Sequence, residues 1–176
     1  NDPDILNPIL STNRSAAAVN AVLFPSLIGR SPYTGEFSTD NALAERWDVA
    51  PDGRTYTFYL HPNVVWSDGD PVDAADFKFT YDAIASDQVE SPYKATLANI
   101  ESITVLDPLR VQVVFREARC DGLGALRIGW LPSHLYDPAF EDIMTSSLNS
   151  NPAVSAGPFL LQSWAPGEAI TMRRNA

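Results

Sequence analysis

Large apolar residues recur at alternate positions just after the sequence Pro51-Asp52-Gly53. Proline presets φ and glycine relaxes it, so this tripeptide favours a tight turn. Tyr56, Phe58 and Leu60 follow at every second position, which is the period of a strand with one buried face. The pattern therefore predicts a β-hairpin over residues 44–60.

Two further stretches predict hairpins for the same reason. In residues 99–115, apolar positions lie on both sides of the turn sequence Asp107-Pro108. In residues 155–175, apolar segments flank Ala165-Pro166-Gly167-Glu168, where proline and glycine again favour a turn. We therefore expect three hairpins along the chain.

Helical signals occur outside these hairpins. Residues 15–23 combine a polar start with an alanine-rich middle and stop ahead of Pro25, because a proline disfavours helical backbone in the residue before it. Residues 120–144 predict short helices interrupted by Pro132 and Pro138. Hairpins with helices between them, without a regular alternation of strand and helix, indicate an α/β fold of the mixed α+β kind.

A third helix follows the turn sequence Ser-Asp-Gly-Asp-Pro. Phe77, Tyr81 and Ile84 lie at i, i+4 and i+7, which places them on one apolar stripe of a helix. Asp73 stands at the N-cap position, and Asp76 three residues later fits the third helical position of a capping box. The segment therefore predicts a helix that begins just after Asp73.

Five aspartates, from Asp68 to Asp82, crowd this segment and raise the question of a calcium loop. An EF-hand that began at Asp68 would need regularly spaced ligands and a glutamate at position 12. Position 12 is Phe79 here, and Pro71 interrupts the ligand positions. We therefore interpret Asp68 and Asp70 as turn residues, and the next two aspartates as capping groups near the positive end of the helix dipole.

The composition argues against several classes of protein. Twenty-two acids against 12 bases give a formal charge of −10, which disfavours binding to nucleic acid or to an anionic membrane surface. The single cysteine, Cys120, excludes an intramolecular disulfide. The two histidines, His61 and His134, lie in no catalytic motif, and no glycine-rich phosphate loop is present. A pair of carboxylates in a cleft stays open as an enzymatic alternative.

Several segments occur in an order that indicates a family. They are NPIL, LAERWDVAPDGRTYTFYLHPNVVWSDGDPVDAADFKFTYDAI, SPYKATLANIESITVLD, LPSHLYD and NPAVSAGPFLLQSWAPGEAITMRRN. Together they resemble the extracytoplasmic solute-binding proteins (family 5) of bacterial oligopeptide, dipeptide and nickel ABC importers. The resemblance covers essentially the whole chain.

This resemblance implies the first lobe of a periplasmic-binding-protein-like type II receptor, in which two lobes enclose the ligand. Residues 1–28 and about 151–176 are expected to form the base-sheet part of this lobe. Residues from about 29 to 150 are expected to form an inserted subdomain of hairpins and a helix. Members of the family are longer, so we expect the chain to be an N-terminal fragment that lacks the second lobe and the segment returning from it.

The resemblance also implies a receptor that captures a peptide or similar small solute and delivers it to the transmembrane subunits of an ABC permease. Such a receptor releases its cargo unchanged, so no enzyme activity, cofactor or metal is expected. The implied location is extracytoplasmic, in the periplasm or as a cell-surface lipoprotein, and the implied state is a monomer. Alternative cargoes are nickel chelates, oligosaccharides and haem, and alternative classes are the carboxylate-dependent cleft enzyme and a stand-alone interaction domain.

Seven residues are candidate ligand contacts by this resemblance. Tyr93, in the sequence Ser-Pro-Tyr, matches a position whose aromatic ring faces the ligand in peptide- and nickel-binding relatives. The segment 24–28, with Pro25, Ser26 and Leu27, matches one whose backbone and acidic residue contact peptides, although proline and serine replace glutamate and glycine here. The remaining candidates, expected near the edge of the cleft, are Asn13, Arg127 and Trp130.

Overall fold

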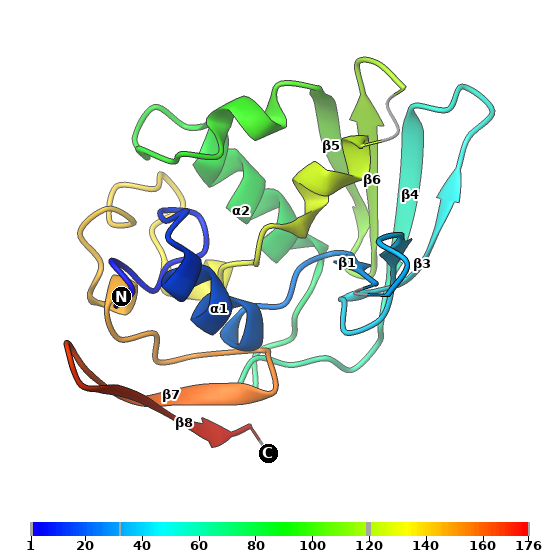
Figure 1. The fold of residues 1–176 in the computed structure, drawn as a ribbon. Helices are drawn as coiled ribbons and strands as arrows, with labels where there is room; N and C mark the ends of the chain where they lie inside the picture. Colours follow the sequence, from blue (N-terminus) through cyan, green and yellow to red (C-terminus); the bar gives the residue numbers. More distant parts are fainter. Residues whose placement is uncertain (1, 32, 119–120, 176) are drawn as a thin grey trace.

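The structure, a computed structural model, describes residues 2–31, 33–118 and 121–175. Its helices and strands, in chain order, are α1 (Arg14–Leu23), β1 (Gly29–Arg30), β2 (Phe37–Ser38), β3 (Ala44–Val49), β4 (Thr55–Leu60), α2 (Ala74–Ala85), η1 (Lys94–Leu97), β5 (Ile100–Asp107), β6 (Arg110–Phe115), η2 (Gly122–Arg127), η3 (Ser133–Leu135), η4 (Ser147–Asn149), β7 (Phe159–Ala165) and β8 (Ala169–Arg174), where η marks a 3₁₀ helix. In Figure 1 the sheet of β3 to β6 stands beside α2, and the β7–β8 hairpin lies below α1 at the other end of the molecule.

The four-stranded sheet is antiparallel throughout, with the strand order β3-β4-β6-β5. All three predicted hairpins are confirmed as β3–β4, β5–β6 and β7–β8. The first two hairpins join where β4 pairs with β6, and Phe58 lies opposite Val111 there. This pairing connects residues far apart in the sequence, so no local pattern predicts it.

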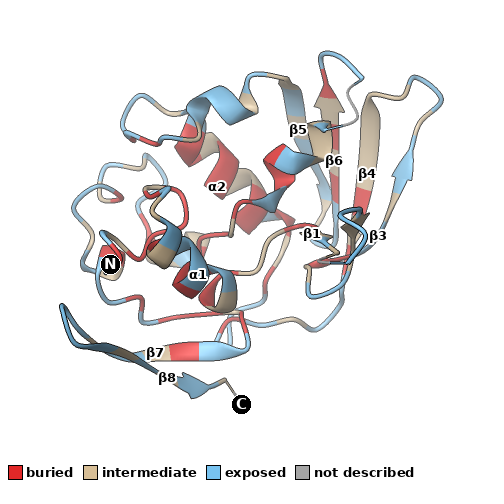
Figure 2. Ribbon diagram, viewed as in Figure 1, coloured by how far each residue is buried: buried red, intermediate tan, exposed pale blue. Residues whose placement is uncertain are grey.

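The sheet and α2 share one apolar core. Phe58 of β4 and Val111 of β6 are fully buried in it. The predicted stripe of α2 is confirmed, because Phe77, Tyr81 and Ile84 are buried as well, and the rings of Phe77 and Tyr81 lie 4.3 Å apart. Figure 2 shows buried stretches on α2, β4 and β6 in red. Burying a side chain of this size stabilises a fold by about 1.5–3 kcal/mol relative to exposing it.

Both α-helices begin at a side-chain cap. The Asp73 carboxylate accepts a hydrogen bond from Ala75 N at 2.7 Å, and the Asp76 carboxylate accepts one from Asp73 N at 3.3 Å. These two bonds confirm the predicted capping box of α2. The carboxamide oxygen of Asn13 caps α1, so this helix begins one residue before the predicted start at Ser15.

We expect the substitution Asp73→Ala to lower the free energy of unfolding by about 1 kcal/mol. It removes the acceptor for the Ala75 amide in the first turn of α2. Asp73→Ser is the matched control, because a serine hydroxyl can cap the same turn and should restore most of the loss. Urea unfolding followed by tryptophan fluorescence measures both variants, and equal losses in the two would contradict the capping role.

Residues 121–144 contain two short 3₁₀ helices, η2 and η3, with turns around them. This confirms the expectation of short helices interrupted by Pro132, since η2 ends before this proline and η3 begins directly after it, and short length is typical of 3₁₀ helices. The predicted start of this stretch, Cys120, lies outside the described residues.

Hydrogen bonds join the segments around α1 to the segment that leads into β7. The carbonyl oxygen of Leu23, at the end of α1, accepts from Gly157 N at 3.0 Å and from Ser155 Oγ at 2.6 Å. Before α1, Leu6 N donates to the carbonyl oxygen of Asn149 at 2.7 Å. The first and last parts of the chain therefore pack together.

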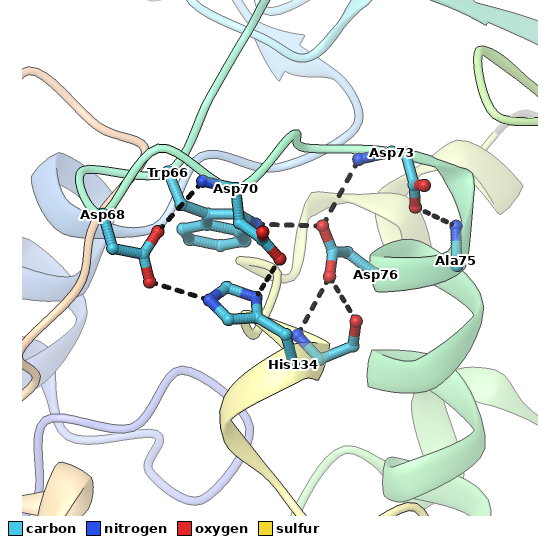
Figure 3. Close-up of polar contacts among 8 residues, drawn as sticks. Trp66, Asp68, Asp70, Asp73, Ala75, Asp76 and His134 are labelled. Atoms are coloured by element: carbon cyan, nitrogen blue, oxygen red, sulfur yellow. Dashed lines mark hydrogen bonds and ion pairs between the residues drawn. The ribbon is translucent and has the colours of Figure 1, made fainter.

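The turn aspartates make contacts that their position in the turn does not predict. Asp68 and Asp70 each direct a carboxylate at a ring nitrogen of His134, at 2.8 Å and 3.3 Å, as Figure 3 shows. Partial burial opposes the ionisation of Asp68, but the hydrogen bond to His134 favours it, and the pKa of Asp68 lies below its ordinary value. The two carboxylates thus connect the turn before α2 to η3.

Asp76 has a larger structural role than the predicted capping box. It is 3% exposed and accepts hydrogen bonds from Trp66 Nε1 at 2.9 Å and from N and Oγ of Ser133 at 2.9 Å and 2.6 Å. Figure 3 shows these bonds converging on one carboxylate. In the described ranges, no group of three or more His, Cys, Asp or Glu side chains is arranged to hold a metal ion.

Candidate functional site

A groove with a volume of about 210 Å³ opens beside helix α1, and we call it the α1 groove. Its walls are the segment before α1, one side of α1, residues 24–26, Tyr93 and residues 127–129. Among the described residues, Arg127 is the single charged residue of this lining, and the lining contains no acid. This local charge is opposite in sign to that of the whole chain, which is −10.

Four of the seven predicted contact residues line the α1 groove, namely Tyr93, Pro25, Ser26 and Arg127. They come from three separate parts of the sequence, which only the folded chain brings together. Their role in binding stays a prediction.

Tyr93 is held at the groove by hydrogen bonds of its hydroxyl and of its backbone N–H. Its hydroxyl donates to the carbonyl oxygen of Ser11 at 2.8 Å. Its backbone N–H donates to Ser91 Oγ at 3.2 Å, and that hydroxyl donates to the carbonyl oxygen of Ile9 at 2.6 Å. Burial raises the pKa of the Tyr93 hydroxyl, so this group remains a neutral donor near neutral pH. The ring is therefore fixed in the groove wall.

The segment of Pro25 and Ser26 is also fixed by its backbone. The carbonyl oxygen of Pro25 accepts from Trp130 N at 3.1 Å, and that of Ser26 accepts from Leu43 N at 3.0 Å. The Ser26 hydroxyl donates to the carbonyl oxygen of Ile28 at 2.9 Å. This segment therefore offers the groove a shaped surface, while its carbonyl groups already serve the fold.

Three of the predicted contact residues, Asn13, Leu27 and Trp130, are not part of the lining of the α1 groove. Leu27 and Trp130 are fully buried in the core. Asn13 uses its carboxamide oxygen to cap α1, where it accepts from the backbone N–H groups of Ser15 and Ala16. The physical reason is that core packing and helix capping already occupy these side chains.

Arg127 is the last residue of η2 and is exposed. No ion pair or hydrogen bond of its side chain is found within the part of the chain that the structure describes. An unpaired guanidinium can bind a carboxylate through two parallel hydrogen bonds. The α1 groove therefore suits a solute with an anionic group.

Three polar residues of the groove, Ser11, Asn20 and Asn41, were absent from the sequence prediction. Asn41 has a φ of 53°, a conformation that asparagine tolerates better than most residues. Asn20 shares the buried face of α1 with Val19 and Leu23. An asparagine among the apolar residues of a helix was the signal in the sequence that could have indicated it.

No helix among the described residues is both long and apolar enough to cross a membrane. The α1 groove combines apolar surface, fixed polar groups and one cation, which is typical of a site that binds a small solute. Its described lining contains no cysteine, histidine or pair of acids that could act as nucleophile or general base. Fold and groove together have the form expected of a lobe that binds a small solute.

The chain belongs to a known family of this class. The family model described as "Bacterial extracellular solute-binding proteins, family 5 Middle" matches residues 39–176. This is the family that the sequence motifs indicate, and its members are solute-binding receptors found outside the cytoplasm.

Three relatives illustrate the similarity. The crystal structure of NikZ from Campylobacter jejuni in complex with Ni(L-His) is 30% identical, with a TM-score of 0.85 over 99% of this chain and 34% of that one. A probable ABC transporter-binding protein of Deinococcus radiodurans is 29% identical over 97% of this chain and 30% of its own length. A putative ABC transporter peptide-binding protein of Brucella ovis is 29% identical over 76% of this chain and 25% of its own length.

The likeness to NikZ confirms the predicted fold class, a mixed α+β lobe of a two-lobed receptor. The chain spans between a quarter and about a third of the length of these relatives.

Proposed function

We propose that the whole protein is the solute-binding component of a bacterial ABC importer and that the α1 groove forms part of its cargo site. The observation that carries this proposal is the meeting of Tyr93, Pro25, Ser26 and Arg127 in one groove of a family 5 chain. The cargo is a peptide or a similar small solute with a carboxylate. The peptide-binding relative from Brucella ovis supports this choice of cargo.

The chemistry of the groove agrees with a transport receptor. Such a receptor releases its cargo intact, so it binds through hydrogen bonds, apolar contacts and charge pairing without reacting with the cargo. Micromolar affinity corresponds to about −8 kcal/mol, and most of it becomes available when a second lobe closes and removes the ligand from water. The isolated lobe should therefore bind its cargo weakly.

The proposed architecture is supported by hydrogen bonds between the two ends of the chain, such as that from Gly157 N to the carbonyl oxygen of Leu23. Residues 1–28 and about 151–176 belong to the base-sheet part of the lobe, and the residues between them form the inserted subdomain. A second lobe of the same polypeptide completes the cargo site. We propose that this receptor acts as a monomer outside the cytoplasm, free in the periplasm or anchored as a lipoprotein, and docks on the transmembrane subunits of the permease.

A second candidate cargo is a metal chelate. It is favoured by the likeness to NikZ, whose structure contains Ni(L-His). The Arg127 guanidinium can bind a carboxylate of a chelating amino acid as well as that of a peptide. The metal would then arrive as part of the cargo.

Mass spectrometry of the solute that co-purifies with the full-length protein tests the proposal most directly. Peptide masses, released on denaturation and absent from a mock purification, are the expected result. Nickel in stoichiometric amount, measured by elemental analysis, would favour the chelate instead. Turnover of the released solute during incubation with the protein would argue against a receptor.

We expect Tyr93→Ala, in the full-length receptor, to weaken binding of the identified solute by about 1–3 kcal/mol. The substitution removes an aromatic ring from the groove wall. Tyr93→Phe is the matched control, because it keeps the ring and removes only the hydrogen bond to Ser11. Isothermal titration calorimetry measures both, and circular dichroism checks that both are folded. An affinity of Tyr93→Ala equal to that of the wild type would remove this residue from the site.

A further inference from the structure

Asn20 has a buried carboxamide that the fold does not use. Its side chain lines the α1 groove, and the residue is 6% exposed. Its carboxamide oxygen is enclosed and has no hydrogen-bond partner among the described residues, and no bond of its amide nitrogen is found in those same ranges. Buried polar groups nearly always have a partner, because an unpaired one keeps the full cost of its desolvation.

The position of Asn20 distinguishes it from the other unpaired buried groups. The described part of the chain contains two more, the indole nitrogens of Trp130 and Trp164. Neither tryptophan lines the α1 groove. Asn20 is therefore the unpaired group that lies where a bound solute could reach it.

The helix itself gives no reason for an asparagine at this position. Asparagine is less favourable in a helix interior than alanine or leucine, and the neighbours of Asn20 on the buried face are Ala16, Val19 and Leu23. On the groove side, Ala17 and Ala21 have short side chains, which leaves room beside the carboxamide. An apolar residue would suit the fold better, so we expect the cargo to supply the hydrogen-bond partner that the carboxamide lacks.

We propose that the carboxamide oxygen of Asn20 accepts a hydrogen bond from a backbone N–H of a bound peptide. This inference rests on the proposed function and makes Asn20 a specificity-determining residue of that same site. The torsion that turns an asparagine carboxamide is broad, and turning it here breaks no hydrogen bond, so the oxygen can face the groove. A carbonyl oxygen of this kind requires a donor, which every peptide bond except one before proline provides.

The charge of the groove limits which part of a peptide can lie there. A peptide ammonium group would find no carboxylate among the described lining residues, and it would lie beside the Arg127 guanidinium. Like charges this close repel each other. The α1 groove therefore takes the neutral backbone and the carboxylate side of the cargo, with Asn20 bonded to the backbone and Arg127 to the carboxylate.

The test uses the full-length receptor, stripped of its cargo, and a random tripeptide library as the probe. Asn20→Leu replaces the carboxamide by an apolar group of similar size, and Asn20→Ala is a second variant that suits the alanine-rich helix. We expect the amount of peptide that each variant retains to be lower than that of the wild type by a factor of about 10 or more. Mass spectrometry of the eluted peptides measures this amount. We also expect the thermal midpoint of unliganded Asn20→Leu to equal or exceed that of the wild type, since an unpaired buried group is removed.

A second probe, the same library methylated at its backbone nitrogens, identifies the bond itself. Methylation should reduce retention by the wild type more than retention by Asn20→Ala, because the partner of the lost N–H is already absent in the variant. Retention like that of the wild type in both variants would overturn the inference and would mean that the carboxamide bonds only to water. A wild type that retains neither library would overturn the peptide cargo itself, an outcome that the wild-type sample alone reveals.

Discussion

Asp76→Ala should lower the free energy of unfolding by about 3–5 kcal/mol. Asp76 is 3% exposed, and removal of its carboxylate leaves Trp66 Nε1 and the backbone N–H of Ser133 without their acceptor. Each unsatisfied buried donor costs about 1–3 kcal/mol, and the cap of α2 loses its second bond as well. Because a domain has only about 5–15 kcal/mol of net stability, a loss of this size strongly increases the unfolded fraction. Urea unfolding followed by tryptophan fluorescence measures it.

Asp82→Ala on the same helix is the matched control. The side chain of Asp82 is 45% exposed and pairs with Lys78 one turn earlier at 2.6 Å. Exposed pairs of this spacing contribute about 0.2–0.5 kcal/mol, so the expected loss is several times smaller. Equal losses in the two variants would show that Asp76 acts as an ordinary helix-surface acid and that its buried bonds contribute nothing.

Gly157→Ala should destabilise the protein by about 3 kcal/mol, at the upper end of the usual cost of overpacking. A Cβ atom at this position would overlap the carbonyl oxygen of Val22 and lie 2.8 Å from its carbonyl carbon. Both are backbone atoms of α1, so no side chain can turn away to relieve the clash. The residue is buried, and its N–H donates to the carbonyl oxygen of Leu23 at 3.0 Å. The clash therefore separates α1 from the segment that enters β7.

Gly124→Ala is the control for the change of glycine to alanine itself. No heavy atom lies within 4 Å of a Cβ built at this position. Such a substitution should be neutral or slightly stabilising, because alanine restricts the unfolded chain more than glycine does. Differential scanning calorimetry measures both variants. A thermal midpoint of Gly157→Ala as high as that of Gly124→Ala would contradict this prediction. It would mean that α1 and the segment before β7 can move apart without loss of stability.

Local elements of the fold were predictable because their signals are short in range. The turn at Pro51-Asp52-Gly53 and the alternation after it specify a hairpin without any distant contact, and the structure confirms it. The cap at Asp73 and the stripe beginning at Phe77 likewise specify α2. Each of these signals depends on backbone preferences and on a single buried face.

The lining of the α1 groove was predictable only in part, because it depends on side-chain orientation and on contacts between distant segments. Tyr93 and Arg127 were expected from the family resemblance, and both line the α1 groove. Leu27 was expected from the same resemblance, as was Trp130, but both are buried in the core, because an alignment places a residue in the chain and does not decide which side of the backbone faces solvent. Asn20 belongs to no motif; its place among apolar helix residues was a weak signal, and its burial without a partner is visible only in the structure.

The aspartate-rich segment shows what the sequence alone determines and what only the tertiary structure decides. By itself the sequence excluded a calcium loop and identified the turn, the cap and the family, since these depend on spacing along the chain. Only the tertiary structure decided that Asp68 and Asp70 face His134 and that Asp76 bonds to Trp66 and Ser133. Ser133 and His134 lie on a distant segment and Trp66 lies ten residues before Asp76, and the free energy that holds these groups together comes from excluding water from a shared interior. Such contacts do not exist until the chain has folded, and the same is true of the α1 groove.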